Sequence, residues 1–270
     1  MDRAVTPRIP LTEPAHGAIA FCGAQLMLLP DGAVWWPEQS CLIVADLHFE
    51  KGSAFAAQGA LLPPWDTRAT LDRLAALITL LRPRSVICLG DSFHDDGAVA
   101  RLPATDRAVL TGLAGQTDWV WVAGNHDPAP AGLDRMGGRL SEEVRLGPLT
   151  LRHEPRPGEV RPPAGTIWGH FHPKGSIALA HRRLTGRCFV FAEGLMILPA
   201  FGAFTGGLDV RDPALERYFP QGYQARLAAR DRLLPVGRDD FLVPRQVAFA
   251  RRQTSAGRGG LKRRPDPDPA

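Results

Sequence analysis

Residues that could bind metal ions occur in five short clusters between residues 46 and 172. The clusters are Asp46-Leu47-His48, Gly90-Asp91, Gly124-Asn125-His126-Asp127, the lone His153, and Gly169-His170-Phe171-His172. Each cluster alone is a weak signal, because an Asp after a strand is usually a turn residue and a single His is usually structural. Five clusters with suitable ligand types together indicate one shared site.

The residue types in these clusters suit a pair of divalent cations. Two such ions about 3.5 to 4 Å apart need a carboxylate that bridges them, and imidazole, carboxylate and amide groups complete each coordination shell. None of the clusters contains a cysteine, which disfavours a structural zinc site. We therefore expect a dinuclear hydrolytic site.

The clusters follow short apolar runs that indicate buried strands. These runs cover residues 26–29, 41–45, 85–89, 119–122, 149–152 and 166–168. An amphipathic pattern over residues 66–81 predicts a helix, and a shorter pattern over about residues 105–113 predicts a second. This alternation is typical of an α/β fold, in which open sheets bind ligands at the carboxyl ends of their strands. Each cluster lies at such an end.

After residue 137 the pattern changes to paired short strands. Residues 139–146 and 149–153 form one expected pair, and residues 175–180 and 188–192 form another. The second half is therefore expected to form an antiparallel or mixed sheet, while residues 211–250 receive no assignment. Gly90 and Gly124 are expected to allow sharp turns. Alternation along residues 169–172 is expected to direct two imidazoles towards different metals.

The composition is that of a folded protein with a charged terminal segment. Of 270 residues, 44% are hydrophobic and 22% are charged, which is ordinary for a globular chain. The net charge of +4 lies in residues 251–270, which hold six Lys or Arg and two Asp. We expect residues 1–250 to form one catalytic domain and residues 251–270 a basic, Pro- and Gly-rich, disordered tail. Nucleic-acid binding is the alternative role for this tail.

The cysteines and the N-terminus indicate a cytoplasmic enzyme. Cys22, Cys41, Cys88 and Cys188 are widely spaced and form no C-x-x-C pair, so we expect reduced core residues. Residues 1–16 lack the apolar segment of a signal peptide, and no apolar run that could span a membrane follows.

The motifs D-x-H, G-D, G-N-H-D, a lone His and G-H-x-H, in this order over about residues 41–195, resemble the calcineurin-like metallophosphoesterase superfamily. The resemblance implies an α/β four-layer sandwich, in which two mixed β-sheets are flanked by helices. It also implies two ligand sets that share Asp91 as the bridging carboxylate. One set adds Asp46, His48 and His172, and the other adds Asn125, His153 and His170.

A mechanism of phosphoester hydrolysis follows from this resemblance. A hydroxide that bridges the metals attacks phosphorus in line, and the cations neutralise the charge that grows on the equatorial oxygens. His126 protonates the leaving oxygen as the general acid, and Asp127 steadies its ring. For Asp127, a simple loop-capping carboxylate is the alternative.

The loop after Asp91 indicates a more specific family within the superfamily. Residues 91–97 lack the Arg with which phosphatases of the superfamily grip a terminal phosphate dianion, and a diester carries one charge fewer. With the segments 46–53 and 59–67, this loop resembles the ligase-associated DNA damage response endonuclease (PdeM) family. The resemblance implies a manganese-dependent phosphodiesterase or endonuclease that acts on DNA in bacterial repair. It implies an ATP-dependent DNA ligase, a helicase and an exonuclease as partners.

Other residues and functions remain as alternatives. His94 could contact the diester or the leaving group, or it could be a loop histidine in a supporting hydrogen bond. Lys51 and Arg152 could touch the phosphate backbone, with solvated charge as the alternative for each. Fe, Zn or Mg are the alternatives to Mn²⁺. A small-molecule phosphoesterase or phosphatase is the second functional hypothesis, and a non-catalytic scaffold, disfavoured because no ligand is missing, is the third.

Overall fold

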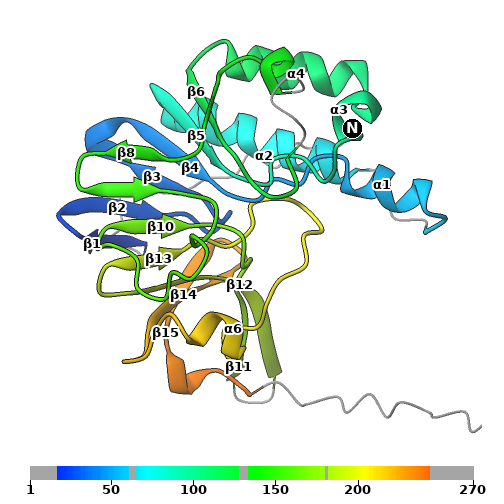
Figure 1. Cartoon of the computed structure of the whole chain (residues 1–270). Coiled ribbons are helices and arrows are strands. Elements are labelled where there is room, and N and C mark those ends of the chain that lie inside the picture. Colours follow the sequence, from blue (N-terminus) through cyan, green and yellow to red (C-terminus); the bar gives the residue numbers. More distant parts are fainter. Residues whose placement is uncertain (1–16, 61–64, 128–132, 180–181, 244–270) are drawn as a thin grey trace, which may run out of the picture.

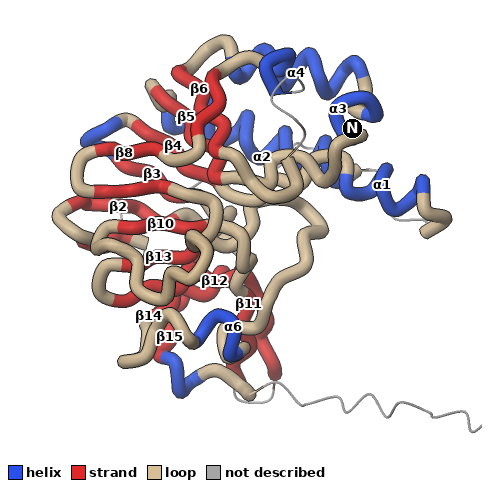
Figure 2. Tube along the Cα trace, in the orientation of Figure 1, coloured by secondary structure: helices blue, strands red, loops and turns tan. Residues whose placement is uncertain are grey.

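The computed structural model describes residues 17–60, 65–127, 133–179 and 182–243. Its strands form two mixed sheets that share a core, and most of its helices gather beside the first sheet (Figures 1 and 2). The predicted α/β fold of two mixed sheets flanked by helices is confirmed. The expected tail over residues 251–270 lies outside the described residues, and the single domain over residues 1–250 stays a prediction.

The first sheet has seven strands in the order β1-β2-β3-β4-β5-β6-β7. The strands β4 to β7 are parallel neighbours, whereas β1 to β4 pair antiparallel. Because β4, β5 and β6 are parallel, their carboxyl ends meet at one edge of the sheet. The bounds are β1 Ala18–Phe21, β2 Ala24–Leu28, β3 Val34–Trp36, β4 Cys41–Val44, β5 Ser85–Leu89, β6 Asp118–Val122 and β7 Arg139–Ser141.

Four helices accompany the first sheet, namely α1 Lys51–Ala57, α2 Asp66–Leu81, α3 Ala98–Arg101 and α4 Ala104–Ala114. The helix α2 has the predicted bounds, and Leu71 on its buried face packs in one core with Leu42 and Val44 of β4. Full burial of such a leucine stabilises the fold by about 1.5–3 kcal/mol. Cys41 and Ile43 of β4 point into the core between the sheets, because successive strand side chains alternate.

The second sheet has eight strands, in the order β15-β14-β12-β13-β10-β9-β8 with β11 paired to β12. Only β9, β10 and β13 are parallel neighbours among its described strands. The bounds are β8 Val144–Leu146, β9 Leu149–Leu151, β10 Thr166–Trp168, β11 Lys174–Leu179, β12 Arg182–Ala192, β13 Leu195–Ile197, β14 Gln224–Ala229 and β15 Arg232–Gly237. The short helix α6 (Pro213–Glu216) lies beside this sheet (Figure 1). Short 3-10 helices cover Pro37–Gln39, Asp134–Met136 and Arg238–Asp240.

The single strand expected over residues 139–146 is wrong, because the structure has two strands in different sheets. The strand β7 ends at Ser141 and pairs with β6, whereas β8 begins at Val144 and pairs with β9. Glu142 and Glu143 occupy the crossover. An apolar pattern predicts extended chain but carries no information about which sheet each half joins.

Residues 211–243, for which the sequence pattern was too weak, contain α6 and the antiparallel pair β14 and β15 at the edge of the second sheet. All four cysteines are free, and Cys41, Cys88 and Cys188 are buried, as expected of core residues, whereas Cys22 is only partly buried. No helix in the described parts of the chain is both long enough and apolar enough to cross a membrane.

Candidate active site

The five predicted clusters meet where the two sheets present parallel strand ends. Three clusters follow β4, β5 and β6 of the first sheet, and two follow β9 and β10 of the second. Within each sheet these strands are parallel neighbours, so their carboxyl ends lie side by side. The backbone N–H of His170 donates to both carboxylate oxygens of Asp46 at 3.1 Å, which joins the ends of the two sheets.

One group of potential metal ligands consists of Asp46, His48, Asp91 and His172, whose ligand atoms all lie within 4.8 Å of one another. His172 Nε2 lies 3.1 Å from Asp46 Oδ1 and 3.3 Å from His48 Nε2. His48 Nε2 lies 3.9 Å from Asp91 Oδ2. These four residues are the set that the resemblance implies for one metal.

A second group consists of Asp91, His153 and His170. Asp91 Oδ1 lies 3.4 Å from His153 Nε2. Asn125 joins this group, because its Oδ1 lies 3.1 Å from His153 Nε2 and 3.1 Å from His170 Nδ1. Asp91 therefore turns Oδ2 towards the first group and Oδ1 towards the second, so that two cations could share this carboxylate.

Left-handed backbone conformations position five of these residues. Asp46, His48, Asp91, His170 and His172 have φ angles between 46° and 65°. A residue other than glycine pays about 1–3 kcal/mol for this conformation, and such residues concentrate at functional sites. His170 and His172 thus reach different groups through loop geometry, and not through the strand alternation that we expected.

Two glycines beside the ligands allow close approach. A Cβ atom at Gly90 would lie 2.2 Å from the His153 ring, and a Cβ atom at Gly124 would lie 2.1 Å from the backbone nitrogen of Asp91. Gly90 has a φ of 73°, which agrees with the predicted sharp turn. A residue larger than glycine at position 124 would collide with Asp91.

The buried carboxylates of Asp46 and Asp91 require positive charge nearby. Asp46 and Asp91 are buried, and their ion pairs within the described parts of the chain are all with histidines. Burial disfavours protonation of His153, but the hydrogen bond to Asp91 and the charges of both aspartates prevail and raise the pKa of His153 to about 9. Burial also opposes ionisation of Asp91, but His153 and the His126 N–H hold the Asp91 pKa below its usual range. A divalent cation would supply this charge.

The histidine nitrogens fit a metal ligand set. Burial lowers the pKa of His48 to about 3, so its imidazole is neutral, as a ligand must be. His153 Nδ1 donates to the Leu89 carbonyl oxygen at 3.1 Å, which leaves Nε2 facing Asp91 and Asn125. Metal-bound histidines commonly have their second nitrogen held in this way. The residues present are therefore arranged to bind divalent cations through oxygen and nitrogen atoms.

His126 lies beside both ligand groups. Its backbone N–H donates to Asp91 Oδ1 at 2.9 Å, and its exposed ring has its centroid 5.7 Å from that of His48. Asp127 Oδ1 accepts the N–H of Phe93 at 3.0 Å, and Oδ2 accepts the N–H of Gly124 at 2.9 Å. Burial raises the pKa of Asp127 to about 6. These contacts are those of a loop-capping carboxylate, which was the alternative role of Asp127. That Asp127 steadies the His126 ring stays a prediction.

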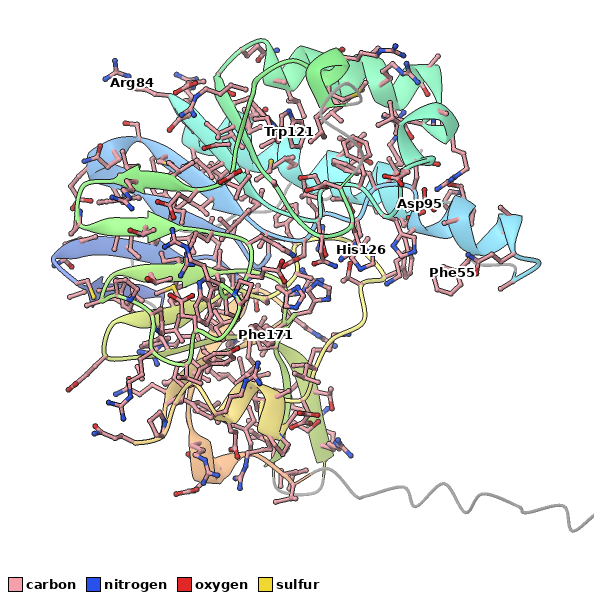
Figure 3. All side chains as sticks on the ribbon, viewed as in Figure 1. Phe55, Arg84, Asp95, Trp121, His126 and Phe171 are labelled. Atoms are coloured by element: carbon pink, nitrogen blue, oxygen red, sulfur yellow. The ribbon has the colours of Figure 1, made fainter. Side chains whose placement is uncertain are left out.

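His94 stacks with two aromatic rings at the site. Its centroid lies 6.0 Å from that of His126 with an interplanar angle of 4°, and 5.8 Å from that of Phe55 with an angle of 28°. Figure 3 shows Phe55 on α1, which projects from the body of the protein, and His126 closer to the sheets. The sequence pattern did not predict α1 and so missed Phe55. The structure places His94 at the site, and its contact with substrate stays a prediction.

Arg152 and Lys51, the two cations that could touch phosphate, have different surroundings in the structure. Arg152 is buried, and its NH2 donates to the two carboxylate oxygens of Glu159 at 3.0 and 2.9 Å, so its charge is already balanced. Lys51 is half-buried and lines a cavity with Lys174, which the sequence motifs did not mark. No local pattern could have shown that residues so far apart in the chain are neighbours. The unassigned His16 and His181 lie outside the described residues.

The chain is similar to known proteins in sequence and in fold. The family described as Calcineurin-like phosphoesterase matches residues 40–196, a range that includes all the candidate ligand positions. Among solved structures, the chain is similar to nuclease MPE from Pseudomonas putida, with 31% sequence identity and a TM-score of 0.59. That match covers 81% of this chain and 98% of the nuclease.

Weaker structural matches include a protein of unknown function, AQ665 from Aquifex aeolicus, and Yfce, a phosphoesterase from E. coli. The first is 16% identical, with a TM-score of 0.35 over 49% of this chain and 78% of its own. The second is 14% identical, with a TM-score of 0.38 over 73% of this chain and 98% of its own. No curated protein matches the chain.

Proposed function

The chain belongs to the calcineurin-like phosphoesterase family and is a metal-dependent phosphoesterase, and from this premise we propose that it cleaves phosphodiester bonds in DNA. The observation that carries the proposal is the pair of ligand groups that share Asp91 at the ends of the two sheets. The 31% identity to a protein described as a nuclease, over 98% of that chain, supports a nucleic-acid substrate.

The two ligand groups would hold two divalent cations. Asp46, His48 and His172 would bind one, Asn125, His153 and His170 would bind the other, and Asp91 would bind both. Bound there, the cations would neutralise charge on the phosphoryl oxygens and lower the pKa of water. A mixed nitrogen and oxygen site accepts several metals. The resemblance to the PdeM family favours Mn²⁺ among them.

We assign proton transfer to the leaving oxygen to His126. Its exposed ring lies next to the first ligand group, and a general acid in such a place contributes about 10²- to 10⁴-fold to the rate. Asp127 acts on this step by bracing the loop through Phe93 and Gly124. His94, whose ring is parallel to that of His126, would contact the diester or its leaving group.

The charge around the loop after Asp91 supports a diester substrate. Residues 91–97 contain no Arg. The next Arg along the chain, Arg101, donates to Asp95 at 2.7 Å and to Ser53 at 3.0 Å, so its guanidinium is already engaged. A phosphate monoester dianion gains most from a bidentate Arg, whereas a diester presents one charge fewer.

We further propose that this activity serves DNA repair in the bacterial cytoplasm. An ATP-dependent DNA ligase, a helicase and an exonuclease are the proposed partners. This part of the proposal rests on the resemblance of the segments 46–53, 59–67 and 91–97 to the PdeM family.

The test is hydrolysis by the manganese-loaded full chain of single-stranded, flapped and end-blocked DNA, and of aryl phosphodiesters and monoesters. Asp91→Ala and His126→Ala serve as controls for a contaminating nuclease. We expect DNA cleavage and a preference for the aryl diester over the monoester. A preference for monoesters without DNA cleavage would instead identify a small-molecule phosphatase, and loss of both activities would identify a scaffold.

A further inference from the structure

A basic pocket adjoins the candidate metal ligands, and the site described above assigns no role to its lysines. A cavity of about 230 Å³ is lined by His172, Lys174, Arg187, Thr205 and Gly206 among others. A second cavity of about 360 Å³ shares Lys174, Thr205 and Gly206 with the first and extends to Lys51. The two cavities are therefore neighbours, one lined by the candidate ligand His172 and the other by Lys51 at the start of α1.

The positive charge of this pocket is only partly balanced. Lys174 Nζ donates to the Thr205 carbonyl oxygen at 3.0 Å and has further donors left. Lys51 has no ion pair within 4 Å among the residues that the structure describes, although Asp66 lines the same cavity and accepts the Gly52 N–H at 2.9 Å. Burial lowers the pKa of Lys51 and of Lys174, and a neighbouring cation lowers each further.

Arg187 fixes the floor of the pocket. Its NH1 donates to the carbonyl oxygens of Asp31, Ala200 and Phe201 at 3.0, 2.9 and 3.3 Å. These carbonyl groups hold the guanidinium in place, and the nearby Asp31 carboxylate balances part of its charge. The residues that line the two cavities include three cations, Lys51, Lys174 and Arg187, and one carboxylate, Asp66, which favours an anionic ligand.

Thr205 and Gly206 line both cavities. Thr205 is 7% exposed, and its Oγ1 has no hydrogen-bond partner among the described residues. A Cβ atom at Gly206 would meet nothing within 4 Å, so space is available at the point that both cavities share. Phe204 lines the cavity with a side chain that is 62% exposed, a suitable surface for a base to stack on.

We propose that the pocket of Lys51, Lys174 and Gly206 binds a phosphate of the nucleic-acid chain next to the phosphate that is cleaved. This inference rests on the proposed function and deepens it, because a second phosphate site selects a chain over a mononucleotide or a small diester. Lysines are common phosphate ligands. Phe204 would stack on the base that is attached to this phosphate.

The first test measures binding of a fluorescent single-stranded oligonucleotide to the full chain at several salt concentrations, in a His126→Ala background that limits cleavage. Each lost phosphate contact lowers the slope of log K against log salt by about 0.7 for single strands. We expect Lys51→Gln with Lys174→Gln to lower the slope by about this amount and to weaken binding about tenfold. Arg232→Gln, on the edge strand β15, is the matched control and should change neither quantity. An unchanged slope in the double lysine variant would overturn the proposal.

The second test separates the pocket from the catalytic centre. A dinucleoside monophosphate offers only the phosphate that is cleaved, whereas a trinucleotide offers a second one. We expect the lysine variants to lower kcat/KM for the trinucleotide about tenfold more than for the dinucleotide, through KM. Gly206→Val, which fills the shared space and keeps both charges, should have the same selective effect. Equal losses on both substrates would contradict the pocket.

The outcomes distinguish failure of this inference from failure of the proposed function. If the chain cleaves DNA but the lysine variants keep the wild-type salt slope, the phosphate pocket is refuted and the proposed nuclease activity stands. Hydrolysis of aryl diesters without cleavage of DNA would refute both the proposed nucleic-acid substrate and the proposed phosphate pocket. Competition by inorganic phosphate against the oligonucleotide, lost in the lysine variants, would support a phosphate site. Competition that persists in the variants would count against it.

Discussion

The backbone N–H of His126 donates a hydrogen bond to Asp91 Oδ1 at 2.9 Å. The loop that carries the proposed general acid therefore also orients the carboxylate that both ligand groups share. This contact belongs to the main chain, so a substitution of the His126 side chain leaves it in place. The roles of the two residues can thus be tested separately.

Replacement of His126 by Ala should slow cleavage of DNA far more than hydrolysis of an aryl diester with a good leaving group. The alkoxide that leaves from DNA needs a proton, whereas a nitrophenolate does not. We expect a loss of about 10²- to 10⁴-fold on DNA and a much smaller loss on the aryl diester. Steady-state kinetics on both substrates provide the measurement.

The control for this variant is its metal content, which should equal that of the wild type because the N–H to Asp91 remains. Equal losses on both substrates would show that His126 does not act as the acid. Metal loss in His126→Ala would assign the residue to the ligand set instead.

Substitution of Gly124 by Ala should abolish most of the activity. The added Cβ would lie 2.1 Å from the Asp91 nitrogen and 2.4 Å from its Oδ1, so the shared carboxylate must move. Even loss of a group that only orients a ligand costs about 10- to 100-fold, and displacement of Asp91 should cost at least as much. Gly112→Ala is the matched control.

Gly112 lies inside α4, and a Cβ there would meet nothing within 4 Å. This control should keep full activity and gain up to about 1 kcal/mol of stability from improved helix propensity. Thermal unfolding and kcat/KM on both variants would check the pair. Full activity in Gly124→Ala would contradict the geometry of the site.

Replacement of Asp127 by Asn should destabilise the loop that carries His126. The two Asp127 oxygens accept backbone N–H groups of Phe93 and Gly124, and the Asn amide nitrogen would face one of them without accepting it. One lost acceptor costs about 1–3 kcal/mol. Denaturant unfolding measures this loss, and an unchanged free energy of unfolding would leave the predicted steadying of His126 as the better account.

The meeting of the five clusters could be predicted from the sequence because each cluster follows closely after a short apolar strand. Asp91 and His153 need only the position of their strands and the rule that parallel strand ends meet. The helix over residues 66–81 was likewise predictable from its apolar spacing. In these places local pattern and tertiary structure agree.

Other features depend on contacts that no local pattern records. The crossover at Glu142 and Glu143 is decided by which sheet accepts each half of an apolar segment. Lys174 and Thr205 come from a strand and a loop far from Lys51 in the chain, and only the fold makes them neighbours. The left-handed backbone at His170 and His172 could not be predicted from the sequence either, because it reflects constraint by the site rather than residue preference.

Removal of the residues after Ala250 should reduce the salt dependence of DNA binding. The net charge of +4 lies in residues 251–270, and each phosphate contact that is lost lowers the slope of log K against log salt by about 0.7 to 0.9. Catalysis on an aryl diester should not change. An unchanged salt slope in the truncated chain would refute a role of this segment in binding DNA.

The most direct test of the two-metal site is the metal content of the full chain after equilibration with Mn²⁺ and removal of excess ion, measured by inductively coupled plasma mass spectrometry. The shared position of Asp91, with Oδ2 towards His48 and Oδ1 towards His153, predicts two ions per wild-type chain. It also predicts that Asp91→Asn, which keeps the shape but removes the charge, loses ions from both positions. One ion per wild-type chain, or two in Asp91→Asn, would contradict the account.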